Sequence, residues 1–151
     1  MMLTGYALED EHTRLLADLR ILSGGNGRMS GAFDELLEVF QIHVDKVEEF
    51  AVPLLKYLER RLAGIDFSNS GSLHADGRFL RQYPLLLEGH RLMVNILRKV
   101  EEFPEFWQNS TARDLVEEMR HHLAMEEQIL YPAVTAAGEI LREHPGIPSG
   151  Q

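Results

Sequence analysis

Apolar residues recur along this chain at intervals of three and four positions, a spacing that keeps them on one face of an α-helix. Four stretches with this pattern predict helices at about residues 8–23, 30–63, 77–103 and 110–143. Clusters of glycine, proline and small polar residues separate them, and the strict alternation of a half-buried strand is absent. The pattern predicts an all-α fold, a single domain over residues 1–151 built as an up-down-up-down four-helix bundle.

Details of the pattern refine the expected helices. Pro53 lies late in the second stretch, and because the apolar period continues beyond it, we expect a kink there and not the end of the helix. In the fourth stretch, the buried face is expected to keep α-helical spacing through Leu115, Met119, His122, Glu126, Ile129 and Ala133.

The two halves of the chain repeat one another. Equivalent residues are 78 positions apart for His12 and His90, and 79 apart for His43 and His122 and for Pro53 and Pro132. This spacing predicts an internal duplication of a helical hairpin, which brings four histidines from four helices together. The residue counts from each histidine to the turn of its hairpin place the rings at nearly equal heights.

Four histidines in one layer of a bundle predict a metal site, although a single one is more often a hydrogen-bonded core residue. Each buried imidazole needs partners for two ring nitrogens, and a metal ion supplies them. Glu126 follows His122 by four residues, so both side chains can reach one ion, the alternative being a boundary glutamate that reaches solvent. The remaining histidines are expected to face solvent or to cap helices: His74, His121 and His144.

Composition narrows the chemistry of such a site. The chain has no cysteine, which excludes disulfides, thiolate metal sites and iron–sulfur clusters, so nitrogen and oxygen atoms must hold any ion. A net charge of −9 argues against nucleic acid and anionic membrane surfaces as partners. No apolar run reaches the length of a membrane span, and the first residues lack the basic start of a signal peptide, so we expect a cytoplasmic protein.

The segment from His122 to Pro132, together with the three histidines on the earlier helices, resembles the hemerythrin-like family, the His-His-Glu cation-binding domain. The resemblance extends from about Tyr6 to Ile140. It implies a four-helix bundle that holds a non-haem iron pair, open to a small diatomic molecule such as dioxygen or nitric oxide. The metal ligands that it implies directly are His12, His43, His90, His122 and Glu126.

One position departs from the pattern of that family. Four residues after His43, where the family has a glutamate, the chain has Val47. We expect Glu48, five residues after His43, to complete the ligand set, with Glu9 as a weaker candidate. If neither reaches, the resemblance implies a mononuclear, asymmetric or poorly occupied site.

Three functions stay open. The first is a hemerythrin-type protein for sensing, storage or redox and iron homeostasis; Val94 replaces a further histidine of the family's oxygen carriers, which disfavours dedicated transport. The second is a ferritin-like di-iron oxidase or peroxidase, because two segments match its Glu-x-x-His spacing: Glu9 to His12 and Glu118 to His121. The third is a degenerate bundle that serves as a regulatory or interaction module, with Val47 as its sign. We expect a binding protein more than an enzyme.

Residues near the seam are candidates for tuning the site. They are an apolar wall of Phe40, Leu86, Met93 and Met125, the hydrogen-bond donors Tyr83 and Tyr131, and Trp107, which is expected to close one end of the bundle and to contribute to a homodimer. Core packing is the ordinary role of the apolar members.

Overall fold

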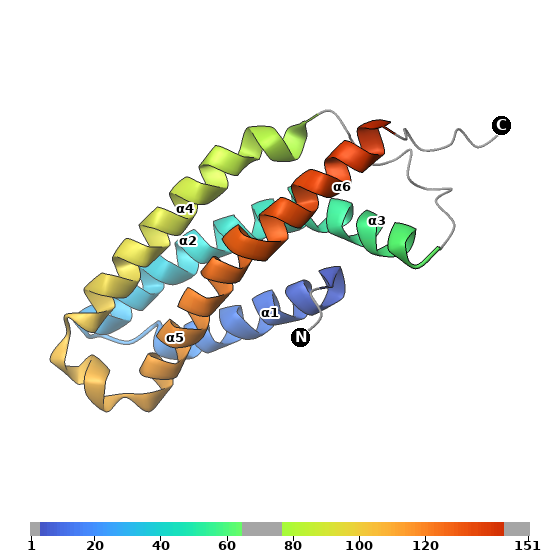
Figure 1. Ribbon diagram of the computed structural model, residues 1–151. Coiled ribbons are helices and arrows are strands. Elements are labelled where there is room, and N and C mark those ends of the chain that lie inside the picture. Colours follow the sequence, from blue (N-terminus) through green and yellow to red (C-terminus); the bar gives the residue numbers. More distant parts are fainter. Residues whose placement is uncertain (1–3, 65–76, 144–151) are drawn as a thin grey trace.

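The computed structural model of the chain describes residues 4–64 and 77–143, and within these ranges it contains helices and no β-strand (Figure 1). The helices are α1 (Gly5–Leu22), α2 (Arg28–Phe50), α3 (Val52–Leu62), α4 (Arg78–Glu101), α5 (Ser110–Met125) and α6 (Tyr131–Glu143). A 3-10 helix, η2 (Pro104–Gln108), precedes α5, and a π-helical turn, η3 (Glu126–Leu130), joins α5 to α6. The predicted all-α class is confirmed. None of the described helices is long and apolar enough to cross a membrane.

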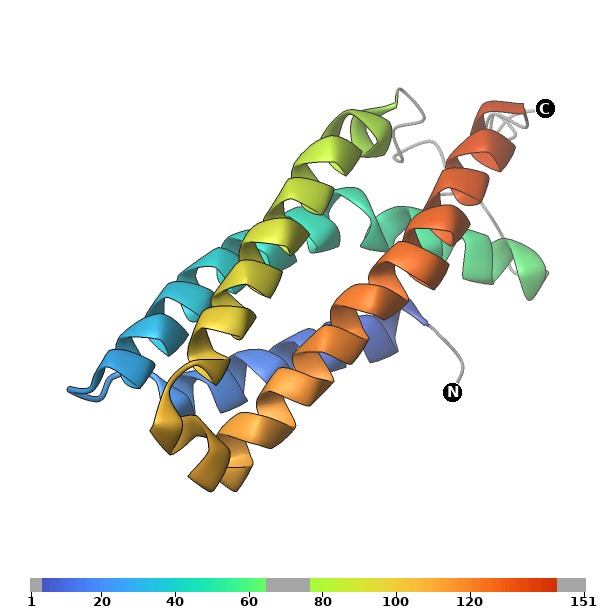
Figure 2. The ribbon, with the colours of Figure 1, turned by 60° about the vertical axis from the view of Figure 1, so that its left-hand side comes forward.

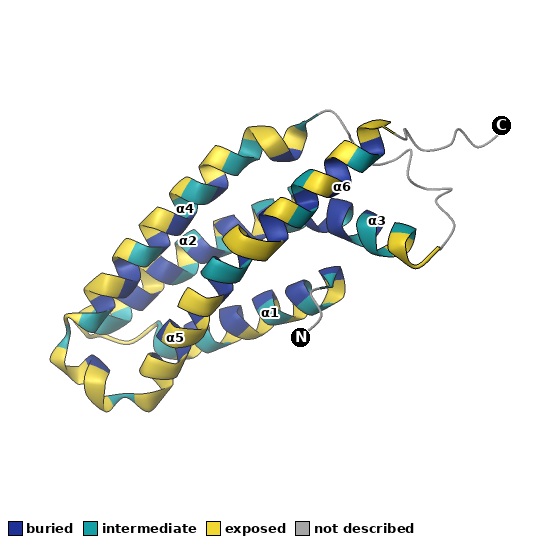
Figure 3. Cartoon of the chain, in the orientation of Figure 1, coloured by how far each residue is buried: buried dark blue, intermediate teal, exposed yellow. Residues whose placement is uncertain are grey.

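The helices pack around a common interior. α2 lies against α1 and α4, α1 contacts α5, and α3 contacts α6, with the continuous rod of α5, η3 and α6 on the other side from α2 (Figures 1 and 2). The buried faces point inward (Figure 3) and form two apolar clusters. One cluster includes Leu15, Phe40, Met93 and Met119, and the other includes Leu8, Val47, Leu86 and Leu130. On α1, α4 and the α5–α6 rod, a histidine lies between residues of the two clusters, so a polar layer separates them.

The helix expected over residues 30–63 is divided into α2 and α3. The kink expected at Pro53 is present, and α3 turns away from the axis of α2 (Figure 2). Proline has no backbone N–H and its ring clashes with the carbonyl four residues earlier, but it fits the first turn of a helix. Pro53 accordingly lies in the first turn of α3, after Ala51.

The fourth expected helix contains a π-helical turn that the sequence pattern did not predict. A π-turn contains one residue more than an α-turn. After it, the positions that face the core are therefore shifted by one residue along the sequence. Leu130 and Val134 are fully buried, whereas Ile129 is 53% exposed. The expected seam through Ile129 and Ala133 is therefore wrong by one residue beyond Glu126.

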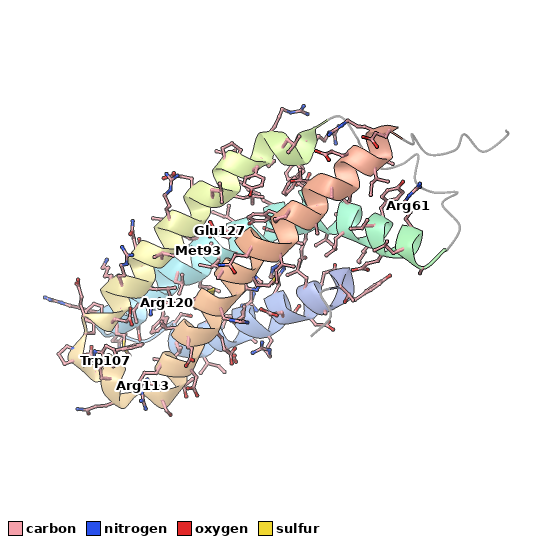
Figure 4. All side chains as sticks on the ribbon, in the orientation of Figure 1. Arg61, Met93, Trp107, Arg113, Arg120 and Glu127 are labelled. Carbon is pink, nitrogen blue, oxygen red and sulfur yellow. The ribbon has the colours of Figure 1, made fainter. Side chains whose placement is uncertain are left out.

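Trp107 lies in η2 at one end of the bundle, as Figure 4 shows. Its indole N–H donates a hydrogen bond to the backbone carbonyl of Glu101, 3.0 Å away, and 57% of its surface is exposed. The indole thus fastens η2 to the end of α4.

Candidate metal centre

Four imidazoles and one carboxylate meet inside the bundle, in the layer between the two apolar clusters. His12 comes from α1, His43 from α2, His90 from α4 and His122 from α5, while Glu126 is the first residue of η3. All five residues are at most 3% exposed. The structure therefore brings together five of the six residues that the sequence singled out.

The carboxylate of Glu126 is shared between two pairs of histidines. Its Oε1 lies 2.8 Å from Nε2 of His43 and 2.9 Å from Nε2 of His90. Its Oε2 lies 3.1 Å from Nε2 of His122 and 3.5 Å from Nε2 of His12. We call these sets, each with its Glu126 oxygen, the His43–His90 group and the His12–His122 group. Each offers two imidazole nitrogens and one carboxylate oxygen close enough together to hold a metal ion.

The hydrogen bonding within the centre fits a metal ion. Although Nε2 of His122 lies near Glu126, it has no hydrogen-bond partner, and neither has Nδ1 of His90. A buried polar atom without a well-formed hydrogen bond is unfavourable, and a cation bound to Nε2 of His122 would give this atom a partner. Imidazole and carboxylate ligands suit iron, zinc, copper and manganese. With three protein ligands in each group, further coordination positions stay open for water or a small molecule.

Two of the imidazole rings are contacted at Nδ1 by carboxylates that lie outside the polar layer. Nδ1 of His12 lies 2.9 Å from Oε2 of Glu48, and Nδ1 of His122 lies 2.7 Å from Oε1 of Glu11. An imidazole that donates its Nδ1–H to a carboxylate keeps Nε2 free and correctly turned for a metal ion. Glu127, on the side of η3 that faces α4 (Figure 4), has Oε1 3.5 Å from Nδ1 of His90.

Glu48, for which a ligand role was expected, contacts a ring of the centre from outside the two groups of donor atoms. It belongs to neither group, because it contacts the nitrogen of His12 that points away from Glu126. Successive residues on an α-helix differ by about 100° in direction, so Glu48 faces α1 while Val47 points into the core, where it is fully buried. Glu9, the weaker candidate, pairs with Nζ of Lys56 at 2.6 Å.

Glu11 is the residue that sequence reasoning missed. It lies beside His12 on α1, at the edge of the buried face, three residues after Leu8 and four before Leu15, and this spacing is the signal that could have marked it. The contact between α1 and α5 brings it to His122. Of the histidines expected outside the site, His121 is exposed, and His74 and His144 lie outside the described residues.

The charges of the centre depend on one another. Burial opposes ionisation of Glu126, but the charge of His122 and hydrogen bonds from the histidines lower its pKa well below the usual range. Burial also opposes protonation of His122, yet Glu126 and Glu11 raise its pKa to about 9. Burial lowers the pKa of His43 despite the nearby carboxylate. Without a metal ion, a protonated His122 therefore balances the Glu126 carboxylate at neutral pH.

Tyr131, the first residue of α6, reaches the His43–His90 group. Its Oη lies 3.1 Å from Nε2 of His90 and 3.4 Å from Oε1 of Glu126. Burial and the nearby Glu126 charge raise the pKa of Tyr131, so the hydroxyl keeps its proton. The ring of Tyr83 packs against that of Tyr131, with centroids 5.2 Å apart.

Of the residues in the expected apolar wall, Phe40 contacts rings of both groups. The ring of Phe40 is T-shaped to those of His12 and His122 and stacks on that of His43. Leu86 and Met93 are buried in the two clusters, and Met125 packs against one of them. The described residues thus form a buried His/Glu cluster that can hold a metal ion. Comparison of the chain with protein-family models, curated proteins and solved structures finds no match.

Proposed function

We propose that this chain is a hemerythrin-like protein that holds two iron ions and binds dioxygen or nitric oxide, for sensing, storage or redox and iron homeostasis. The observation that carries the proposal is the division of Glu126, with one carboxylate oxygen for each pair of histidines. A single carboxylate placed in this way can bridge two ions, one in each group.

The sequence repeat supports two related ion sites. A twofold relation between the halves of the chain exchanges His12 with His90 and His43 with His122. The same exchange converts the His12–His122 group into the His43–His90 group. This supports an up-down-up-down bundle of two duplicated hairpins, with an ion site on each side of the twofold axis.

In this proposal, the residues of the chain hold the ions and exclude bulk water. The four imidazoles and Glu126 are the ligands, and Glu11 and Glu48 fix the rings of the His12–His122 group. The apolar ring of Phe40 packs in T-shaped geometry against the same two imidazole rings. Iron in this centre would supply an open coordination position and a change of oxidation state.

A degenerate bundle that acts as an interaction module is the second candidate, and Val47 favours it. Val47 stands where the repeat places the counterpart of Glu126, and it cannot bind a metal ion. The ferritin-like alternative has less support, because the glutamates of its two spacing motifs are paired elsewhere: Glu9 with Lys56, and Glu118 with Arg14.

Metal analysis tests the proposal. Protein purified from iron-rich medium should contain close to two iron ions per chain, and azide or dioxygen should change its visible spectrum. His122→Ala should remove most of the iron while leaving the helix content intact. The matched control is His121→Ala, at the exposed neighbouring position, which should leave the iron content unchanged. An absence of iron after loading would favour the degenerate module.

A further inference from the structure

The two groups of the centre have different surroundings. In the His12–His122 group, a carboxylate holds each ring from behind: Glu48 at 2.9 Å and Glu11 at 2.7 Å. The ring of Phe40 is T-shaped to both rings, with centroid separations of 6.1 and 5.9 Å, and it also stacks on His43 of the other group at 6.3 Å. In this half of the centre, both imidazole rings are fixed by carboxylates.

The His43–His90 group has a hydroxyl beside its donor atoms. Tyr131 is fully buried, and its Oη lies 3.1 Å from Nε2 of His90 and 3.4 Å from Oε1 of Glu126. Val47, which is apolar, occupies the position that the repeat relates to Glu126. This half therefore has a hydrogen-bond donor and lacks the second carboxylate that the repeat would give it.

A metal ion in this group changes the hydrogen bonding of Tyr131. An imidazole nitrogen that binds a metal ion has no lone pair left to accept a hydrogen bond, so Nε2 of His90 stops being an acceptor. The 3.4 Å contact with Glu126 is longer than an ordinary O–H···O hydrogen bond. Because a buried hydroxyl without an acceptor is unfavourable, a bound molecule that offers an acceptor atom to Tyr131 gains affinity.

We propose that Tyr131 is the hydrogen-bond donor that selects and orients a small anionic ligand at the His43–His90 group. This inference rests on the iron centre proposed above and assigns exogenous ligand binding to one of its two halves. The ligand class is a linear or bent anion of two or three atoms with a free acceptor atom, for which azide is the probe. A neutral ligand with a poor acceptor atom, such as carbon monoxide, gains little from Tyr131.

Tyr131→Phe removes the hydroxyl and keeps the ring. The iron content should remain that of the wild type, whereas the azide dissociation constant should rise about tenfold or more, the effect of a hydrogen bond to a charged group. Carbon monoxide binding to the ferrous protein should change by no more than about twofold. Tyr83→Phe is the matched control, because it removes a hydroxyl from the adjacent ring and should leave azide affinity unchanged.

A spectroscopic measurement tests the same contact without a mutation. The vibrational band of bound azide should shift between H₂O and D₂O in the wild type and in Tyr83→Phe, but not in Tyr131→Phe. Equal azide affinity and an equal shift in Tyr131→Phe would overturn the inference while the iron centre stands. A tyrosinate-to-iron absorption band in the wild type would also overturn it, because Tyr131 would then be a ligand. Wild-type protein without iron would instead refute the proposed function.

Discussion

Nδ1 of His122 and Oε1 of Glu11 are 2.7 Å apart, and this contact joins α1 to α5 behind the candidate metal centre. His122 is fully buried, whereas the side chain of Glu11 is 19% exposed. A negative charge at the edge of the bundle therefore acts directly on a ring in its interior. The contact lowers the pKa of Glu11 and helps to raise that of His122.

Glu11→Gln should weaken metal binding without unfolding the bundle. Loss of a carboxylate behind a ligating histidine typically reduces metal affinity about 10- to 100-fold, because the ring becomes less basic and less well oriented. Competition with a chelator of known affinity measures the change. Asp10→Asn, which removes the same charge from an exposed neighbouring position, should have little effect. Equal losses in both variants would attribute the effect to net charge alone.

Metal binding should release a proton at neutral pH. The metal-free protein holds His122 protonated, since its pKa is raised to about 9, and a metal ion requires the neutral ring. Below pH 9, the release of this one proton should therefore lower the apparent metal affinity about tenfold for each unit by which the pH decreases. Calorimetric titration in buffers of different ionisation enthalpy counts the proton. A binding enthalpy independent of the buffer would contradict this prediction.

The metal-free protein should lose stability on the alkaline side. The pKa of His122 in the folded protein, about 9, lies above the ordinary 6.5 of an unfolded chain. Its contribution to stability is therefore complete below pH 6.5 and disappears as the pH rises through 9. Thermal unfolding of metal-free protein between these pH values measures the loss. In His122→Asn, most of the pH dependence should vanish, whereas His121→Asn should retain it.

Glu126 predicts the opposite behaviour in acid. Its pKa is lowered in the folded protein, so its contribution to stability is present above the ordinary value of 4.5. That contribution disappears as the pH falls through the lowered folded pKa. Metal-free Glu126→Gln should therefore show a weaker loss of thermal stability in acid than the wild type. An unchanged acid transition would indicate that other carboxylates determine it.

Val47→Glu should make the bundle depend on metal. The position is fully buried, so without an ion a new carboxylate there should destabilise the fold by roughly 3 kcal/mol. With iron, the same carboxylate would restore the arrangement of the other half and strengthen binding at the His43–His90 group. The difference in Tm between iron-loaded and metal-free protein should therefore be larger than in the wild type. The control is Val44→Glu, at a buried apolar position one turn earlier on α2. In this variant, the difference in Tm between iron-loaded and metal-free protein should not increase.

The sequence was sufficient to predict the all-α class and the residues that meet in the centre. Each of the four histidines lies on the apolar face of its helix, and a side chain on that face must point into the core. Glu126 follows from the same logic, because it lies one turn after His122. Regular periodicity thus determined which polar side chains are buried.

The remaining features depend on contacts between helices, which periodicity does not describe. Nothing in the spacing of residues 126–130 distinguishes a π-turn from an α-turn, so the α-helical pattern places Ile129 on the wrong face. Glu11 and Glu48 lie at the edges of the buried faces, and only the packing of α1 against α5 and α2 determines which histidine each carboxylate reaches. The roles of such residues follow from three-dimensional structure.

The polar layer lies between two apolar clusters, and its five side chains are almost entirely hidden from water. An ion can enter or leave such a layer only when neighbouring helices separate transiently. Loading and loss of iron should therefore be slow and should follow the frequency of local opening, which amide hydrogen exchange on α1 and α5 would report. Once filled, the protein would retain its metal ion through brief exposure to a chelator, because packing slows the loss of an ion in addition to the strength of its binding.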